Sequence, residues 1–333
     1  MVYIYKKPIG NKNYYYLRAS EKKGKKLITK DIAYLGNSIE NVKLSLEKIS
    51  KYKAEIRKSY KTINSFLESN HFLEKVKKLK LKKNTLLKEK TDEIEACNLH
   101  YHNVFDKLDE LSKKEIFKNY IIEFAYNTAS IEGNTISLEE ARNLLNEGIT
   151  PKDKTLREVY DLQNTEKVFF EILNSKLDNE LEHGFIIWVH DRLLENIDER
   201  KGYRTTDIRV IRSNFEASPG KYVKTDMDLL IKWYNNNRNK FHPLILAASF
   251  HHKFERIHPF MDGNGRTGRM IMNFILLKNR LPPTIIRKKT RKEYLEALRE
   301  SDTSGLWKVD KNYANLFSYC SDEFIEAYWS IFL

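Results

Sequence analysis

The stretch His258–Arg269 combines residue types that can bind a polyphosphate and move a proton, and it reads His-Pro-Phe-Met-Asp-Gly-Asn-Gly-Arg-Thr-Gly-Arg. Gly263 and Gly265 relieve the backbone, so that peptide N–H groups at the start of a following helix can face an anion. Arg266 and Arg269 are three residues apart, about one helical turn, and can reach the same ligand. The spacing therefore predicts an anion site at a helix start.

Two further side chains of this stretch fit the same chemistry. Asp262 is a carboxylate beside the expected phosphates, where proteins commonly hold Mg²⁺ by one or two oxygens. His258 precedes the glycines and suits a base that takes a hydroxyl proton near neutral pH. A histidine before proline alone would indicate a helix end, and Gly-Asn-Gly alone a turn. All of these residues within one short stretch indicate a functional site.

The same residues match the pattern His-Pro-Phe-x-(Asp/Glu)-Gly-Asn-Gly-Arg-x-x-Arg at every fixed position, and the chain resembles the Fic (Fic/DOC) family over roughly residues 100–300. The resemblance implies an all-α bundle that transfers AMP from ATP to a Ser, Thr or Tyr hydroxyl of a target protein or of itself, releasing diphosphate. It makes His258 the general base and Asp262 the ligand of Mg²⁺ or Mn²⁺. It assigns the phosphates to Gly263, Asn264, Gly265, Arg266 and Arg269.

A second stretch, Thr128–Thr135, is typical of a helix end when taken alone, because Gly133 and Asn134 tolerate the left-handed conformation. Beside the first motif it resembles the family's inhibitory pattern (Ser/Thr)-x-x-x-Glu-(Gly/Asn), on a helix near 120–134. The resemblance places the chain in the subclass with an N-terminal inhibitory helix. Glu132 would then pair with Arg269 and push ATP into a non-productive pose. In some relatives the same glutamate assists removal of AMP, so a bifunctional or predominantly AMP-removing enzyme is an alternative.

The segment Tyr203–Phe215 favours a short extended hairpin, since Ile208, Val210 and Ile211 are β-favouring. It resembles the family's target-docking flap, with Tyr203, Ile208 and Val210 as candidate docking residues. An exposed strand edge can register a peptide by main-chain hydrogen bonds. An ordinary surface hairpin is the alternative.

The positive charge of the chain is concentrated at one end. Residues 1–90 hold 24 Lys and Arg against 8 Asp and Glu, whereas the remaining residues hold 35 against 38. A field of this kind commonly serves nucleic acid, and solvated helix faces in a lysine-rich chain are the alternative. A nucleic-acid-associated regulator that works through residues 1–90 is thus the rival to an enzyme. The family resemblance adds a homodimer to the expected partners.

The pattern of residue types predicts a mainly α fold with a small β-module. Residues 1–36 contain three β-favouring runs and are expected to form a meander. Residues 37–95 show helical spacing with many lysines and are expected to form a basic helical adaptor. Residues 96–333 are expected to form the catalytic domain, with helices near 104–128, 138–147, 155–176, 181–196, 224–238, 243–257, 264–279 and 290–300.

Composition limits the class of protein. With 41% hydrophobic and 12% aromatic residues, the chain has enough apolar material for a large core. Two cysteines cannot build a disulfide framework, and residues 1–10 show no apolar leader. No apolar run approaches the roughly 20 residues that a membrane span needs. We therefore expect a cytoplasmic protein without a membrane partner.

Overall fold

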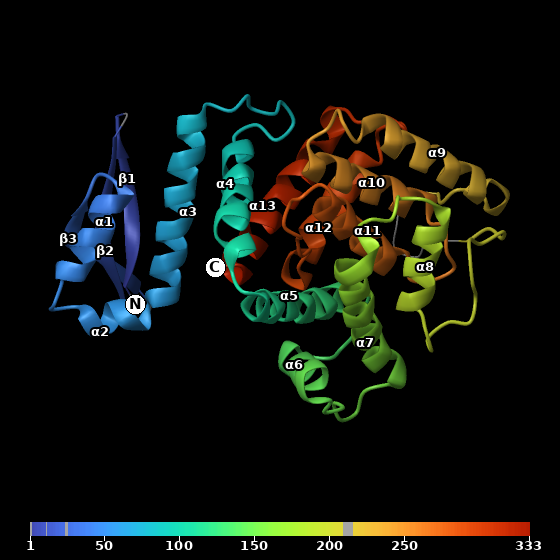
Figure 1. Cartoon of the computed structure of the whole chain (residues 1–333), viewed down its shortest axis with the longest axis horizontal. Helices are drawn as coiled ribbons and strands as arrows, with labels where there is room; N and C mark the ends of the chain where they lie inside the picture. The colour runs from blue at the N-terminus through green and yellow to red at the C-terminus, as the bar shows by residue number, and fades with distance from the viewer. Residues whose placement is uncertain (1, 11, 24–25, 209–215) are drawn as a thin grey trace. The chain divides into compact units, whose positions relative to one another are not determined.

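The computed structural model describes residues 2–10, 12–23, 26–208 and 216–333 (Figure 1). Its strands are β1 Val2–Ile9, β2 Lys12–Lys23 and β3 Lys26–Gly36. Its α-helices are α1 Ile39–Lys48, α2 Lys53–Lys58, α3 Tyr60–Leu79, α4 Lys90–Asn103, α5 Glu110–Ile131, α6 Leu138–Glu147, α7 Leu156–Glu171, α8 His183–Leu193, α9 Val223–Asn237, α10 Pro243–Ile257, α11 Asn264–Lys278, α12 Arg291–Ser301 and α13 Ala314–Ile331. The expected mainly α fold with a small β-module is confirmed.

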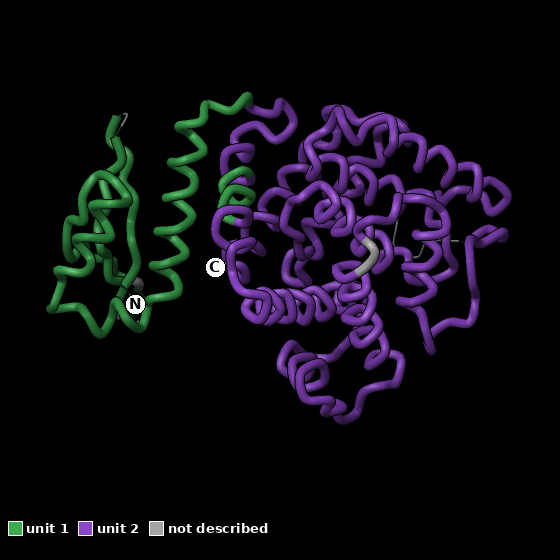
Figure 2. The backbone as a smooth tube through the Cα atoms, viewed as in Figure 1, with its two compact units in different colours: residues 1–82, 95–100, 333 green, residues 83–94, 101–332 purple. Residues whose placement is uncertain are grey.

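The chain divides into two compact units (Figure 2). The first consists of residues 1–82, 95–100 and 333, and the second of residues 83–94 and 101–332. The three strands belong to the first unit, and helices α5 to α13 belong to the second.

The sheet of the first unit is an antiparallel meander in the order β1-β2-β3. Tyr5 lies opposite Tyr16, which in turn lies opposite Tyr34, and the pairing of β2 with β3 shifts register just before Tyr16 and just after Leu17. Strands alternate their side chains between two faces. Leu17 and Leu35 point into a core that also contains Ile39 and Val42 of α1 and Ile63 and Leu67 of α3.

Helices α10 and α11 pack against each other in the second unit and bury almost all of their apolar side chains. α9 and α13 pack on α10, whereas α5 and α8 pack on α11. The eight predicted helices of this region are present: α5 begins six residues after its predicted start, α7 ends five residues before its predicted end, and the other bounds agree within three residues. The spacing analysis did not predict α4 or α13. Among the described helices, none has the length and apolar character that crossing a membrane requires.

The predicted hairpin near Tyr203–Phe215 is only partly covered by the structure. Tyr203–Ile208 contain no strand in the part that is described, and Val210 lies outside the described residues. The segment after Ile208 therefore stays a prediction.

Candidate functional site

The junction between α10 and α11 carries the His258–Arg269 motif. α10 ends at Ile257 because His258 adopts a left-handed conformation, with φ at 53°, and a proline follows. Gly263, with φ at 74°, is the N-cap residue that precedes α11, and a Cβ at this position would overlap Leu194. The loop between the helices is fastened by Asn264, whose side chain accepts a hydrogen bond from Phe260 N at 2.9 Å and donates one to Phe260 O at 2.8 Å.

His258 is held by the helix that precedes it. Its Nδ1 lies 3.2 Å from the carbonyl oxygen of Glu255, and a protonated Nδ1 donating there leaves Nε2 as the free base. Burial is the main cause that lowers the pKa of His258, partly opposed by that backbone contact. The ring is therefore neutral near neutral pH, which a general base requires.

Arg269 is buried against the end of α5. Its Nε donates to Thr128 Oγ1 at 2.8 Å, and its Nη2 donates to Thr128 O at 3.0 Å and to Glu132 Oε1 at 2.7 Å. Only 3% of the Arg269 side chain is exposed, against 44% for Glu132. Burial opposes the charge, but Glu132, Tyr294 and Glu255 together outweigh it and raise the pKa of Arg269. The structure thus brings Thr128 and Glu132 of the predicted inhibitory motif into contact with Arg269 of the His258–Arg269 motif.

The carboxylate of Glu132 also lies over the first turn of α11. A Cβ on Gly265 would overlap Glu132 Oε1 and come within 2.9 Å of Arg269 Nη1. The first amides of a helix have no partner within the helix and attract negative charge. Glu132 therefore places an anion where the sequence predicts phosphates to bind.

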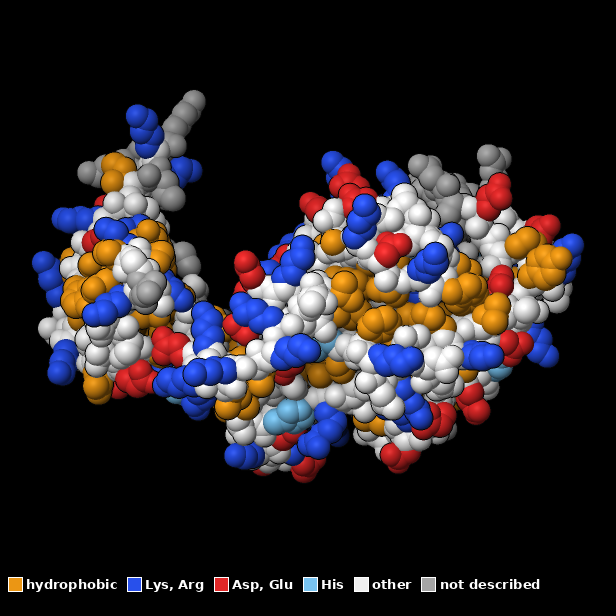
Figure 3. Space-filling view, turned by 90° about the horizontal axis from the view of Figure 1, so that it is seen from above, with side chains coloured by type: hydrophobic (Ala, Val, Ile, Leu, Met, Phe, Trp, Pro, Cys, Tyr) orange, Lys and Arg blue, Asp and Glu red, His pale blue; other side chains and the backbone are white. Residues whose placement is uncertain are grey.

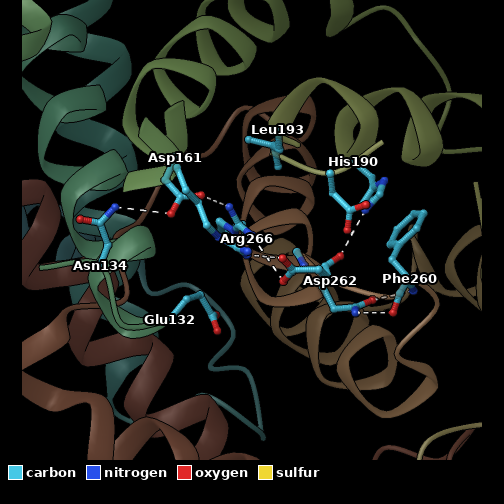
Figure 4. A network of polar contacts seen from close by, with 12 residues as sticks. Glu132, Asn134, Asp161, His190, Leu193, Phe260, Asp262 and Arg266 are labelled. Atoms are coloured by element: carbon cyan, nitrogen blue, oxygen red, sulfur yellow. Dashed lines mark hydrogen bonds and ion pairs between the residues drawn. The ribbon is translucent and has the colours of Figure 1, made fainter. Parts of the chain in front are cut away.

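Arg266 is buried between two carboxylates rather than directed at open solvent (Figure 4). Its Nη1 pairs with Asp161 of α7, and its Nη2 lies 3.5 Å from Asp262 Oδ1. Asn134, which follows Glu132 by two residues, donates to Asp161 Oδ2 at 3.4 Å and to Glu158 O at 2.9 Å. A continuous set of contacts thus runs from the Glu132–Gly133–Asn134 segment through Asp161 to the α11 motif. Sequence analysis did not find Asp161, because a single acid on an amphipathic helix carries no motif.

Asp262 is a partly exposed carboxylate at the edge of the site. It accepts a hydrogen bond from Gly263 N at 2.6 Å and pairs with Arg157 of α7. Burial works against its ionisation, but Arg266 and Gly263 N prevail and hold its pKa below the usual range. His190 of α8 also holds this loop. Its ring stacks on that of Phe260 with 3.7 Å between the ring centroids, and its Nε2 lies 3.2 Å from Asp262 O.

A cavity of about 300 Å³ contains most of the predicted site residues. The predicted residues that line it are Glu132, His258, Asp262, Gly263, Asn264, Gly265, Arg266 and Arg269. α12 closes the cavity with Arg291, Tyr294, Leu295, Leu298 and Arg299. Thr128 lies behind Arg269 and does not line it.

The start of the predicted flap is anchored to the same loop by Arg204, which sequence analysis missed. Its backbone N–H donates to Pro259 O at 2.9 Å, and its Nε donates to His258 O at 2.8 Å. Tyr203 packs on Phe260 at 5.3 Å and lines a second cavity of about 220 Å³ beside the first. Ile208 is partly exposed and does not line either cavity.

Comparison with known proteins identifies this arrangement. Residues 180–276 match the model of the Fic/DOC family. The chain is 29% identical over 214 residues to protein adenylyltransferase fic-1 of Caenorhabditis elegans, covering 62% of this chain and 42% of that protein. It is 33% identical over 190 residues to fic-1 of Caenorhabditis briggsae, covering 55% and 37%. The chain thus spans less than half the length of these relatives.

Solved structures show the same fold. A Fic-domain signalling protein from Bacteroides thetaiotaomicron superposes with a TM-score of 0.64 at 24% identity, over 71% of this chain and 94% of that one. Fic-1 of C. elegans superposes with a TM-score of 0.62 at 24% identity, over 74% and 72%. The helical bundle and the loop between α10 and α11 define a Fic-type fold. Residues 180–276 thus match the Fic/DOC family, and the chain shares the fold of its solved members.

Proposed function

We propose that the chain is a protein adenylyltransferase that transfers AMP from ATP to a side-chain hydroxyl of a protein. The observation that carries this proposal is that His258, the first turn of α11 and Arg269 line one cavity. A neutral imidazole, bare helix-start amides and a guanidinium in one cavity are what a nucleotidyl transfer needs. The names of the relatives point to the same reaction.

In this proposal His258 takes the proton of the attacking hydroxyl at Nε2, while its Nδ1 stays bonded to Glu255 O. The amides of Asn264 and Gly265 bind phosphate oxygens, whereas the Gly263 amide first has to leave Asp262 Oδ1. Arg269 binds the outer phosphate once Glu132 has left it. Arg266 is a positioning residue in this proposal: its guanidinium is already paired with Asp161 and Asp262, and these ion pairs hold the start of α11 in place.

A divalent cation fits the donor set only together with the nucleotide. Mg²⁺ prefers oxygen ligands and is commonly bound by one or two carboxylates plus substrate phosphates. Among the described residues there is no cluster of three or more candidate ligands, and Asp262 is a carboxylate that lines the cavity next to Gly263. When bound, the cation would neutralise phosphate charge. Asp262 would have to release Arg157 to hold it.

We further propose that Glu132 restrains the enzyme. Its carboxylate neutralises Arg269 and lies over Gly265, so it excludes a phosphate from both positions by charge and by volume. Its side chain remains 44% exposed, so it can leave the cavity without disrupting a sealed core. Restraint therefore depends on a movable residue rather than on the fold.

The experiment compares the wild-type chain, Glu132→Gly and Glu132→Gly/His258→Ala after incubation with Mg²⁺ and ATP labelled in the α-phosphate. We expect strong labelling of a protein by Glu132→Gly, weak labelling by wild type and none by the double variant. Intact-protein mass spectrometry should show an AMP adduct. Absence of α-phosphate label from the Glu132→Gly sample would refute AMP transfer, and equal labelling by wild type and Glu132→Gly would refute the restraint.

A further inference from the structure

The sheet of the first unit has two unlike faces. Val2, Ile4, Tyr15, Leu17 and Leu35 point into the core that α1 and α3 complete. Because side chains alternate along a strand, their neighbours project from the opposite face. These neighbours form the tyrosine face, which consists of Tyr3, Tyr5, Tyr14, Tyr16 and Tyr34.

The rings of the tyrosine face are close enough to form one surface. Tyr34 lies 5.4 Å from Tyr16 and 6.4 Å from Tyr14, measured between ring centroids. Arg18 lies on the same face, with its guanidinium 3.6 Å from the centroid of Tyr5. Tyr34 is 54% exposed although apolar rings are usually buried. The other four tyrosines of this face are partly exposed, and a contiguous aromatic patch that remains accessible to solvent indicates a binding site.

Charge around the tyrosine face is strongly positive. Residues 1–36 hold nine Lys and Arg against Glu21 and Asp31. Asp31 is already paired with Arg18 at 2.6 Å, and Lys7, which lies opposite Tyr14, is exposed on the same face. Figure 3 shows hydrophobic side chains of this unit, tyrosine included in that colour, among Lys and Arg. The ligand that suits this surface is therefore an anion with flat apolar faces.

We propose that the tyrosine face binds single-stranded nucleic acid, with bases stacked on the tyrosine rings and phosphates near Lys7 and its neighbouring lysines. Unpaired bases present ring faces that stack on aromatic side chains whatever their sequence. The bases of a duplex are already stacked on each other and offer only their edges. DNA and RNA strands share this chemistry. The proposal rests on the first unit alone and does not depend on AMP transfer.

The test measures fluorescence anisotropy of labelled oligo-dT, oligo-rU and a DNA hairpin with the full-length chain at several salt concentrations. We expect the single strands to bind more tightly than the hairpin. Tyr16→Ala/Tyr34→Ala should weaken single-strand binding at least fivefold, since stacking on one ring is worth about 1 kcal/mol or more and 1.4 kcal/mol is tenfold. The matched control is Tyr60→Ala, which removes a 65% exposed tyrosine of α3 outside this face and should bind as wild type does.

A second pair of variants keeps the proposal testable if the double alanine variant unfolds. Tyr34→Phe preserves the ring and should bind like wild type, whereas Tyr34→Ala alone should bind less tightly. Lys7→Gln should reduce the slope of log K against log salt by about 0.7, the value for one phosphate of a single strand. Equal affinity for the hairpin, equal binding of poly-glutamate, or unchanged binding by folded Tyr16→Ala/Tyr34→Ala would overturn the proposal. A preference between oligo-dT and oligo-rU would identify the strand.

Discussion

Glu132 Oε1 lies 2.7 Å from Arg269 Nη2, and the two residues come from helix ends that are far apart in the sequence. α5 delivers Glu132 at its last turn, and α11 delivers Arg269 in its second turn. Thr128, one turn before Glu132, accepts two further hydrogen bonds from the same guanidinium. Thr128 and Glu132, both from the inhibitory pattern, therefore bind the same guanidinium, that of Arg269.

The first prediction concerns the charge of Glu132 alone. Glu132→Gln keeps the volume over Gly265 but removes the negative charge, so Arg269 becomes available to an outer phosphate. A hydrogen bond to a charged group is worth about 1.5–3 kcal/mol, so we expect ATP to bind ten- to a hundredfold more tightly by calorimetry. Glu123→Gln, which removes a carboxylate elsewhere on α5, is the control. Unchanged ATP affinity in Glu132→Gln would mean that volume alone restrains the site.

The second prediction concerns the protonation of His258. Burial lowers its pKa below the ordinary value of 6.5, so the neutral base predominates at pH 7 and is lost as the pH falls through the lowered pKa. In the Glu132→Gly background, the rate of AMP transfer should stay flat from about pH 8 to 6.5 and decline below that. His258→Ala should be inactive throughout. A tenfold decline between pH 7.5 and 6.5 would contradict a lowered pKa.

Sequence patterns predicted most of the elements with strong periodicity. The helix over 138–147 matches α6 at both ends, because Ser137 and Glu140 form a capping box and Gly148 ends the helix. α4 was missed because its polar and apolar residues are distributed evenly around the helix, so its sequence shows no apolar face. α13 was also missed, although its exposed residues Ser318, Asp322, Glu326 and Ser330 recur every four positions opposite a buried face, so its pattern is present in the sequence.

The candidate site was predictable only where residues lie in one motif. The contact between Glu132 and Arg269 followed from two recognisable patterns. Asp161 and Arg204 reach the same loop from α7 and from the predicted flap, and their partners are remote in sequence. Such pairings depend on how helices pack, which local residue types do not encode. Packing also decides that Asn264 fastens Phe260 with its side chain.

The third prediction concerns the buried pair of Asp161 and Arg266. Their side chains are 10% and 4% exposed, so Asp161→Asn leaves a buried cation with less compensation. Removing one partner of a buried pair costs about 3–5 kcal/mol. We expect the lower end in the free energy of unfolding by urea, because Asp262 remains 3.5 Å from Arg266.

The control for that measurement is again Glu123→Gln, whose partner Arg142 is 52% exposed. Exposed ion pairs contribute about 1 kcal/mol or less, so this variant should unfold close to wild type. Equal unfolding of Asp161→Asn and Glu123→Gln would show that Asp161 does not stabilise Arg266.

The fourth prediction concerns Glu255, whose side chain is largely buried beside Arg269 and His251. Its Oε1 lies 4.0 Å from His251 Nδ1 and has no hydrogen-bond partner among the described residues. Burial raises its pKa to about 8, against 4.5 in an unfolded chain, with Arg269 opposing the shift and Glu132 adding to it. Glu255 is therefore protonated in the folded protein at pH 7.

Between pH 4.5 and 8 the unfolded chain then binds fewer protons at Glu255 than the folded chain does, so the free energy of unfolding declines as the pH rises through this window. Glu255→Gln removes the titrating group and keeps a neutral side chain of similar size. We expect urea unfolding at several pH values to show the variant gaining stability relative to wild type from pH 5 to 8, with no further gain above pH 8. A difference between the two proteins that stays constant across this range would show that Glu255 is ionised in the folded state.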